Sequence, residues 1–396
     1  MVKFTQVIIM SSKFTIKEIF DDHWDSFLDV YPNIRPVVNS EVRKVIGCGD
    51  PNNGCALYVC PDCGAYRFVP FRCHSRFCNT CGTAYQSDRA DSISLKLINC
   101  SHRHVVFTIA EELRSYFRKD RSLLHVLFRS SAQVISDWLY SLNHKENFTA
   151  GMVVALHTFG RDLKWNPHIH MLLTEGAAGN FTVWRHIRHF PYIMLRKRWM
   201  TTLLYNMKAA LNPDLFDIAQ FNSLVSFLYR KYPDGFYVNA PYKEDFNSPM
   251  AVANYITRYI GRPVMAQSRI TDYDGTNVSY WYQRHEDNAI VPVTEHAFEF
   301  IKKLIIHIPD KGFNMLRYYG LYALPAKRTA SLVRFIRNCI TQYMKCKKLW
   351  AWRIELSFNY DPLKCPCGGN MKFSSIYIPF TSTHPPPDLL KYAQYT

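Results

Sequence analysis

Two Cys-x-x-Cys pairs, Cys60/Cys63 and Cys78/Cys81, constrain the folding of this chain more than any other feature. Fourteen residues separate the pairs, and four thiolates at this spacing are typical of a closed tetrahedral zinc site. A thioredoxin-like redox centre would instead have one such pair beside a βαβ pattern. Because structural zinc couples metal binding to folding, we predict a zinc-binding domain over residues 47–99.

Further candidate ligands lie in the same stretch. Cys48, Cys55, Cys73 and His74 are enough for a second zinc ion, an assignment that rests on counting ligands. Three arginines, Arg67, Arg72 and Arg76, are interleaved here with aromatic residues. The pattern is compatible with a domain that docks on DNA through these arginines and equally with a zinc ion that only stabilises the fold.

The overall charge indicates the kind of partner. The chain has a formal charge of +16 and contains 26 Phe, 25 Tyr and 8 Trp. Basic residues contact phosphates and aromatic rings stack on bases, so nucleic acid is the favoured partner. The longest apolar runs are too short to span a membrane, and the run over residues 7–10 is too short for a signal peptide. We therefore expect a cytoplasmic protein without membrane contact.

Hydrophobic periodicity predicts the fold class. After a helical pattern over residues 13–46, the chain reads as a strand at 103–109, a helical region at 110–143 that breaks near Asp120, and two strands at 152–159 and 165–173. This order predicts an α+β fold, an antiparallel-sheet palm with helices on one face. The expected division is a helical lead-in (1–46), the zinc-binding domain (47–99), the α+β domain (100–290) and a basic helical C-terminal region (291–396).

A pair of histidines lies in the last of these strands. Side chains alternate along a strand, so His168 and His170 share one face and form half of a divalent-metal site. The alternative is two ordinary surface histidines. His157, on the preceding strand, is a candidate third ligand if it faces the same side, although a buried core histidine would fit the same pattern.

A short helix is predicted at residues 248–263, with Ser and Pro at its start and Gly and Pro at its end. Tyr255 and Tyr259 are four residues apart and therefore lie on one face, with Arg258 and Arg262 beside them. A tyrosine hydroxyl, with a pKa near 10, needs an activated electrophile, and a phosphodiester held by a divalent cation and arginine is one. The alternative is an amphipathic helix with two half-buried tyrosines.

Taken together, the cysteine-rich module, His-hydrophobic-His and Tyr-x3-Tyr resemble the two-tyrosine rolling-circle transposases of the IS91 type. The resemblance extends from about His23 to about Met371. Its motifs are Cys60-Pro-Asp-Cys63-Gly64, Phe77-Cys78-Asn79-Thr80-Cys81, His157-Thr158-Phe159-Gly160-Arg161-Asp162-Leu163, Asn166-Pro167-His168-Ile169-His170, Asn254-Tyr255-Ile256-Thr257-Arg258-Tyr259, His307-Ile308-Pro309 and Arg317-Tyr318-Tyr319-Gly320. In one departure, Cys365-Pro366-Cys367 looks like a Cys-x-x-Cys pair that has lost one residue, which puts a metal role for these cysteines in doubt.

The resemblance implies an activity and its cofactors. In such enzymes the histidine pair holds Mg²⁺ or Mn²⁺, and a tyrosine attacks single-stranded DNA to give a 5′-phosphotyrosine and a free 3′-hydroxyl. Tyr255 and Tyr259 would be the nucleophiles, Zn²⁺ would be structural, and the partners would be single-stranded and element-end DNA in a bacterial nucleoid. A plasmid replication initiator or relaxase, and a zinc-dependent DNA-binding protein without catalysis, are the alternatives. The sequence leaves the oligomeric state open.

Overall fold

The computed structural model describes residues 14–240, 264–323 and 361–378, apart from residues 76, 95, 99, 188 and 285. The expected tyrosine helix, with Tyr255, Tyr259, Arg258 and Arg262, lies outside the described residues, as does Arg76. The described chain divides into two compact units. One comprises residues 14–85, 264–311 and 361–378, and the other comprises residues 86–240 and 312–323.

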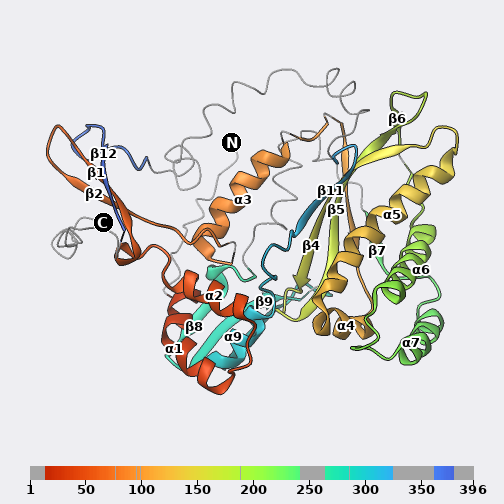
Figure 1. Cartoon of the computed structure of the whole chain (residues 1–396), viewed down its shortest axis with the longest axis horizontal. Coiled ribbons are helices and arrows are strands. Elements are labelled where there is room, and N and C mark those ends of the chain that lie inside the picture. Colours follow the sequence, from red (N-terminus) through yellow and green to blue (C-terminus); the bar gives the residue numbers. More distant parts are fainter. Residues whose placement is uncertain are drawn as a thin grey trace. The chain divides into compact units, whose positions relative to one another are not determined.

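The second unit is built on a six-stranded antiparallel sheet (Figure 1). Its strands are β3 (His102–Phe107), β4 (Thr149–Phe159), β5 (Trp165–Ala178), β6 (Arg185–His186), β7 (Val238–Asn239) and β11 (Leu316–Gly320). The order is β11-β4-β5-β3-β7, and β6 pairs with β5. The two longest strands, β4 and β5, lie side by side at the centre, where the residues are buried along nearly their whole length.

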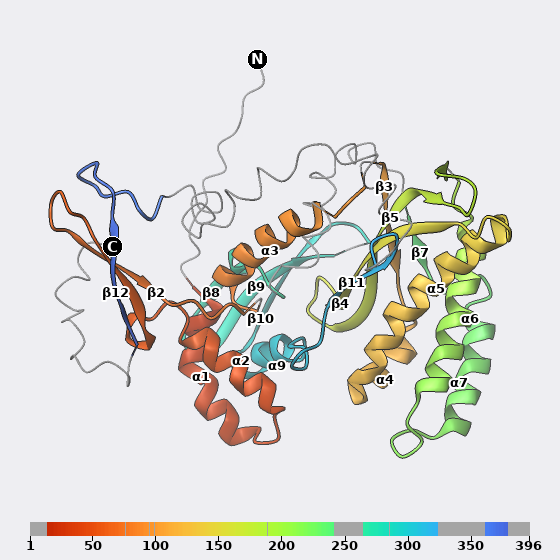
Figure 2. The same ribbon diagram turned by 45° about the horizontal axis from the view of Figure 1, so that its top comes forward.

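Helices cover one face of this sheet (Figures 1 and 2). They are α4 (Arg114–Lys119), α5 (Leu124–Leu142), α6 (Tyr192–Ala210) and α7 (Ile218–Lys231), with short 3₁₀ turns η2 (Glu111–Leu113) and η3 (Arg121–Leu123). The predicted break is confirmed at Asp120, which ends α4 and accepts a hydrogen bond from the backbone N–H of Ser122. Phe107 of β3 packs on Trp199 of α6 at 5.1 Å between ring centroids.

The face that carries the helices is opposite to the histidines. Phe107 pairs with Ile169 across the sheet, and Ile169 lies between His168 and His170 in β5. Because neighbouring residues of a strand point to opposite faces, the histidine side chains point away from α6. The antiparallel α+β prediction is confirmed.

The first unit contains two helices from the N-terminal region, α1 (Ile16–Val30) and α2 (Pro36–Ile46). A capping box of Thr15 and Glu18 starts α1, as the sequence pattern of a polar cap followed by an apolar stripe requires. The helices pack beside α9 (Ala297–Ile305), and the T-shaped contact of Phe27 with Phe298 at 5.3 Å belongs to this core. A separate antiparallel sheet has the order β10-β9-β8. Its strands are β8 (Ile270–Tyr273), β9 (Asn277–Gln283) and β10 (Ile290–His296), and the 3₁₀ turn η4 (Gln267–Arg269) precedes β8.

A three-stranded ribbon completes this unit. Strands β1 (Cys55–Val59) and β2 (Tyr66–Pro70) form a hairpin that follows η1 (Pro51–Asn53), and α3 (Asn79–Ser94) comes after them in the chain. The third strand is β12 (Lys372–Tyr377), which pairs antiparallel with β1, so that segments from near the two ends of the chain lie side by side (Figure 2). Within the described residues, no helix has both the length and the apolar character needed to cross a membrane.

Candidate functional site

Three histidines from the central strands meet on the face of the sheet opposite to the helices. His157 of β4 pairs directly with His168 of β5, and Ala155 pairs with His170, so all three imidazoles lie on one face. One ring nitrogen from each histidine lies within 4.8 Å of the others. His157 and His170 are buried, and His168 is half-buried. The structure thus brings together the three histidines that the sequence singled out.

Hydrogen bonds fix the orientation of two of the rings. His168 Nδ1 lies 2.7 Å from the carbonyl oxygen of Asn166 and donates to it, which leaves Nε2 as the lone-pair nitrogen. His170 Nδ1 lies 2.8 Å from His104 Nε2. If His170 donates in that hydrogen bond, its Nε2 also presents a lone pair, 3.0 Å from Nε2 of His168. Two lone pairs this close repel each other unless a cation binds between them, so the donor set fits a metal ion.

Burial keeps the site in the form that binds metals. Burial, followed by the neighbouring imidazoles of His157 and His168, holds the pKa of His170 well below its usual range. This imidazole is therefore neutral at neutral pH, and only neutral imidazole is a ligand.

His104 is a site residue that the sequence analysis missed. Its ring lies edge to edge with that of His170 and nearly in the same plane, with 5.0 Å between centroids and 5° between planes. The signal for it was a histidine in the predicted strand 103–109, but its contact with His170 depends on how that strand pairs with β5. In the structure His104 pairs with Leu172.

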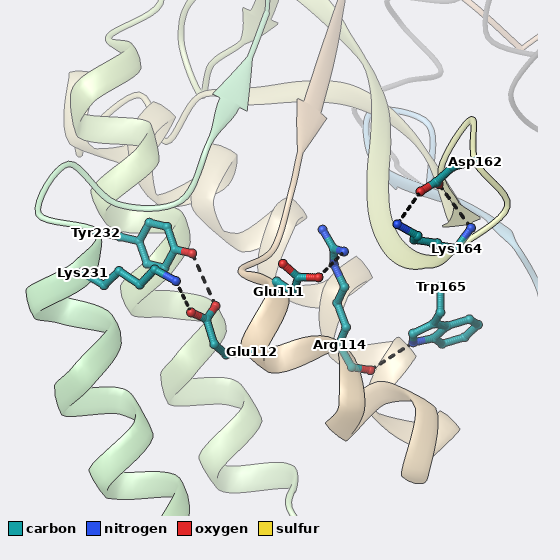
Figure 3. A network of polar contacts seen from close by, with 8 residues as sticks. All are labelled: Glu111, Glu112, Arg114, Asp162, Lys164, Trp165, Lys231 and Tyr232. Atoms are coloured by element: carbon teal, nitrogen blue, oxygen red, sulfur yellow. Dashed lines mark hydrogen bonds and ion pairs between the residues drawn. The ribbon is translucent and has the colours of Figure 1, made fainter. Parts of the chain in front are cut away.

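A network of polar contacts anchors the start of β5 (Figure 3). Trp165 Nε1 donates to the carbonyl oxygen of Arg114 at 3.0 Å, and Arg114 forms an ion pair with Glu111 at 3.5 Å. Next to it, Glu112 accepts from Lys231 of α7 at 2.5 Å. Because Trp165 lies three residues before His168, its hydrogen bond to Arg114 helps to hold the histidine strand against α4.

Four cysteines of the N-terminal region form a compact cluster. They are Cys48, Cys73, Cys78 and Cys81, and their sulfur atoms all lie within 4.8 Å of one another. The Sγ–Sγ distances are 3.5 Å for Cys48–Cys81, 3.5 Å for Cys73–Cys81 and 3.7 Å for Cys78–Cys48. Zinc–sulfur bonds of about 2.3 Å give a tetrahedron with edges of about 3.8 Å, so the cluster has the size of a zinc site. A disulfide would bring two sulfur atoms to about 2 Å.

The structure groups the cysteines differently from the set that the sequence spacing favours. Cys60 and Cys63 form a cluster with Cys365 and Cys367 instead of with Cys78 and Cys81. The reason is the length of the β1–β2 hairpin, which has Cys60 and Cys63 at its tip. Five strand residues at about 3.4 Å each carry this tip about 17 Å from the base, where the chain continues to the other cluster.

Two further candidates of the proposed second zinc set are not in either cluster. Cys55 is buried in β1, and burial raises the pKa of its thiol. His74 is exposed and has a positive φ of 53°. The structure thus does not bring Cys48, Cys55, Cys73 and His74 together as one group, although Cys48 and Cys73 lie beside Cys78 and Cys81. Of the arginines, Arg67 donates to the carbonyl oxygen of Pro362 at 2.5 Å, and Arg72 is exposed.

Comparison with known proteins gives consistent matches. Residues 19–109 match the family model described as "Transposase zinc-binding domain", and residues 151–330 match the model described as "Putative transposase". The chain is 27% identical over 353 residues to the transposase for insertion sequence element IS801 of Pseudomonas savastanoi pv. phaseolicola, an alignment that covers 86% of this chain and 84% of the relative. It is 23% identical over 319 residues to the protein y4qJ of Sinorhizobium fredii, which is named as a transposase. This alignment covers 77% of this chain and 79% of the relative. No solved structure matches.

Proposed function

This chain belongs to the transposases of IS91-type insertion sequences and has their N-terminal zinc-binding domain; from this premise we propose that it nicks and rejoins single-stranded DNA through a 5′-phosphotyrosine intermediate. The proposed reaction moves an insertion sequence by a rolling-circle mechanism. The observation that carries the proposal is the convergence of His157, His168 and His170 on one face of an antiparallel sheet, opposite to the face on which α6 packs.

The proposed nucleophiles are Tyr255 and Tyr259. They lie in the segment that matches the same family model as the histidines, which covers residues 151–330. Attack by a tyrosine oxygen on the phosphorus forms the P–O(Tyr) bond and breaks the bond to the 3′ oxygen, which leaves as a hydroxyl after taking up a proton. The number of phosphoester bonds is unchanged. A 3′-hydroxyl can therefore reverse the step without an external energy source.

The histidines would hold the divalent cation of this reaction. When bound, such an ion neutralises the charge that develops on the phosphate oxygens. The group offers three imidazole nitrogens and no carboxylate among the described residues. Mg²⁺ prefers oxygen ligands, whereas imidazole binds Mn²⁺ better, so we propose Mn²⁺ as the better of the two cofactors. Arg258 and Arg262 are proposed to contact the phosphate beside the tyrosines.

The zinc-binding domain is proposed to be structural and to present its basic residues to DNA. Cys48, Cys73, Cys78 and Cys81 are the proposed ligands of one zinc ion. Residues 47–99 would dock on element-end DNA, with Arg72 and Arg76 as contacts, and residues 100–290 would carry out the chemistry. Such a protein would act in the bacterial cytoplasm at the nucleoid. The same chemistry would serve a replication initiator or relaxase, but the two relatives carry transposase names.

Tyrosine-to-phenylalanine variants test the proposal. Phenylalanine keeps the ring and removes only the hydroxyl, so Tyr255→Phe and Tyr259→Phe should fold and bind DNA as the wild type does. Wild-type protein mixed with single-stranded element-end DNA should give an adduct that survives denaturation. Each single variant should lose one linkage, and the double variant should form none. Adduct formation by the double variant, or a linkage mapped to another tyrosine, would disprove the assignment.

A further inference from the structure

Four cysteines from near the two ends of the chain meet in the first unit. Cys60 and Cys63 lie at the tip of the β1–β2 hairpin, and Cys365 and Cys367 lie shortly before β12. Their sulfur atoms are all within 4.8 Å of one another. The Sγ atoms are 3.6 Å apart for Cys60–Cys367 and also for Cys63–Cys365. These distances match the edge of about 3.8 Å expected for a tetrahedral zinc–thiolate site.

The two cysteine pairs are held by the same kind of backbone turn. At the first pair, the N–H of Gly64 donates to the carbonyl oxygen of Cys60 at 2.9 Å, and the N–H of Cys60 donates to the carbonyl oxygen of Ala65 at 2.8 Å. At the second pair, the N–H of Gly368 donates to the carbonyl oxygen of Cys365 at 2.9 Å, and the N–H of Cys365 donates to the carbonyl oxygen of Gly369 at 2.8 Å. Each hydrogen bond of the second turn spans one residue fewer. A turn that is one residue shorter therefore holds Cys365 and Cys367 in the same way as the longer turn holds Cys60 and Cys63.

A glycine in the left-handed backbone conformation ends each turn at the equivalent position. Gly64 has a φ of 72° and Gly368 a φ of 92°, values that residues with a side chain rarely adopt. Each glycine directly follows the second cysteine of its pair. Both pairs also have proline after the first cysteine. The two segments are thus structurally equivalent although about 300 residues separate them in sequence.

We propose that Cys60, Cys63, Cys365 and Cys367 bind a second structural zinc ion, which closes a zinc ribbon made from both ends of the chain. The strands of this ribbon are β1, β2 and β12. The matched zinc-binding domain ends at residue 109 and does not contain Cys365 or Cys367. The proposal does not depend on the nicking chemistry, because it concerns a separate set of ligands.

The packing around the cluster supports this assignment. Cys60 and Cys365 are buried together with Met371, while Cys63 and Cys367 are exposed. Gly369 lies so close to the first pair that an added Cβ would be 3.1 Å from Cys60 Sγ and 2.1 Å from Asp62 Oδ2. This small sheet has little apolar core, and domains of this kind usually need a metal ion or disulfides for stability.

The first experiment counts zinc in the full-length protein. Wild-type protein should contain two zinc ions per chain, and the variant with both Cys365→Ser and Cys367→Ser should contain one. Cys55→Ala is the matched control, because Cys55 lies in the same strand system but in neither cluster, and it should keep two zinc ions. Two zinc ions in the Cys365→Ser/Cys367→Ser variant, or one in the wild type, would overturn the proposal.

A second experiment needs no substitution of the ligands. In wild-type protein, Cys60, Cys63, Cys365 and Cys367 should all resist alkylation until a chelator is added. Peptide mapping by mass spectrometry will show which cysteines are alkylated. A protease site introduced between residues 323 and 361 then tests the connection of the chain ends. After cleavage the C-terminal fragment should stay bound and be released by chelation. Free alkylation of Cys365 and Cys367, a disulfide at these residues, or release of the fragment while zinc is present would each refute a shared site.

Discussion

His104 Nε2 lies 2.8 Å from His170 Nδ1, and the planes of the two rings are only 5° apart. This contact orients His170 so that its other nitrogen faces His168 and His157. Partners that hold the second nitrogen of a metal-binding imidazole set its tautomer and its direction. His104 is therefore a positioning residue for the proposed metal site, although it is not one of the three ligands.

We expect His104→Leu to weaken Mn²⁺ binding by about 10- to 100-fold, because His170 then loses its hydrogen-bond partner. The dissociation constant can be measured by electron paramagnetic resonance titration of free Mn²⁺. His104→Gln is the matched control, since its amide oxygen can accept from His170 Nδ1 and should restore most of the affinity. Equal affinity in both variants would show that His104 does not position the ligand.

Direct removal of a ligand should affect cleavage and not DNA binding. His168→Gln should lower the cleavage rate by about 100-fold or more, since the proposed ion supplies several kcal/mol of charge stabilisation in the transition state. Affinity for single-stranded DNA rests on basic and aromatic contacts and should change little. His186→Gln, at an exposed histidine of β6, is the control and should cleave normally. Wild-type activity in the His168→Gln variant would remove the histidines from the mechanism.

The choice of ion gives an independent test. Three imidazole ligands should favour Mn²⁺ over Mg²⁺, so wild-type cleavage should reach half of its maximum at a lower concentration of Mn²⁺. The comparison is made by titrating each ion into chelator-treated protein that retains its zinc. A lower midpoint for Mg²⁺ would indicate that oxygen ligands complete the site.

Local patterns predicted much of this structure. The alternation of strand residues was sufficient to place His168 and His170 on one face, and the polar residue Asp120 in a long apolar pattern marked the helix break. Both features depend on residues a few positions apart. The α+β class followed in the same way, because the order of strands and helices limits how layers can pack.

Features that depend on pairing between distant segments could not be predicted from such local patterns. The spacing of Cys60 and Cys63 predicts a metal-binding turn but does not say which second turn it meets, and the true partner is about 300 residues away. Similarly, the contact of His104 with His170 follows from the register of β3 against β5. That register is fixed by the packing of Phe107 and other core residues and is not encoded in either strand alone.

A buried histidine should make stability depend on pH. His102 donates from Nδ1 to the carbonyl oxygen of Cys100 at 2.8 Å and accepts at Nε2 from the hydroxyl of Tyr322 at 2.6 Å, which satisfies its neutral form. Burial lowers the pKa of His102 to about 4, against an ordinary value of 6.5. The unfolded chain therefore binds this proton first as the pH falls, and stability decreases between pH 6.5 and 4.

The expected contribution of His102 over this range is about 3 kcal/mol, at about 1.4 kcal/mol per pKa unit. It can be measured as the free energy of unfolding in urea at several pH values. Because other titratable groups also contribute to the pH dependence of stability, the difference between wild type and His102→Gln isolates this residue. The variant should have the shallower pH dependence, and parallel curves would contradict the assignment.

Pairs of cysteine substitutions distinguish the observed grouping from the one that the sequence spacing favours. In the structure Cys63 and Cys365 belong to one cluster, and Cys78 belongs to the other. A variant with Cys63→Ser and Cys365→Ser should therefore lose one zinc ion, and a variant with Cys63→Ser and Cys78→Ser should lose both. If Cys60, Cys63, Cys78 and Cys81 shared one ion, the second variant would lose only that ion. Zinc content per chain decides between these outcomes, and the effects on unfolding give a second readout. Substitutions within one site should be less than additive, because the second removes a ligand from a site already lost, whereas substitutions in different sites should add.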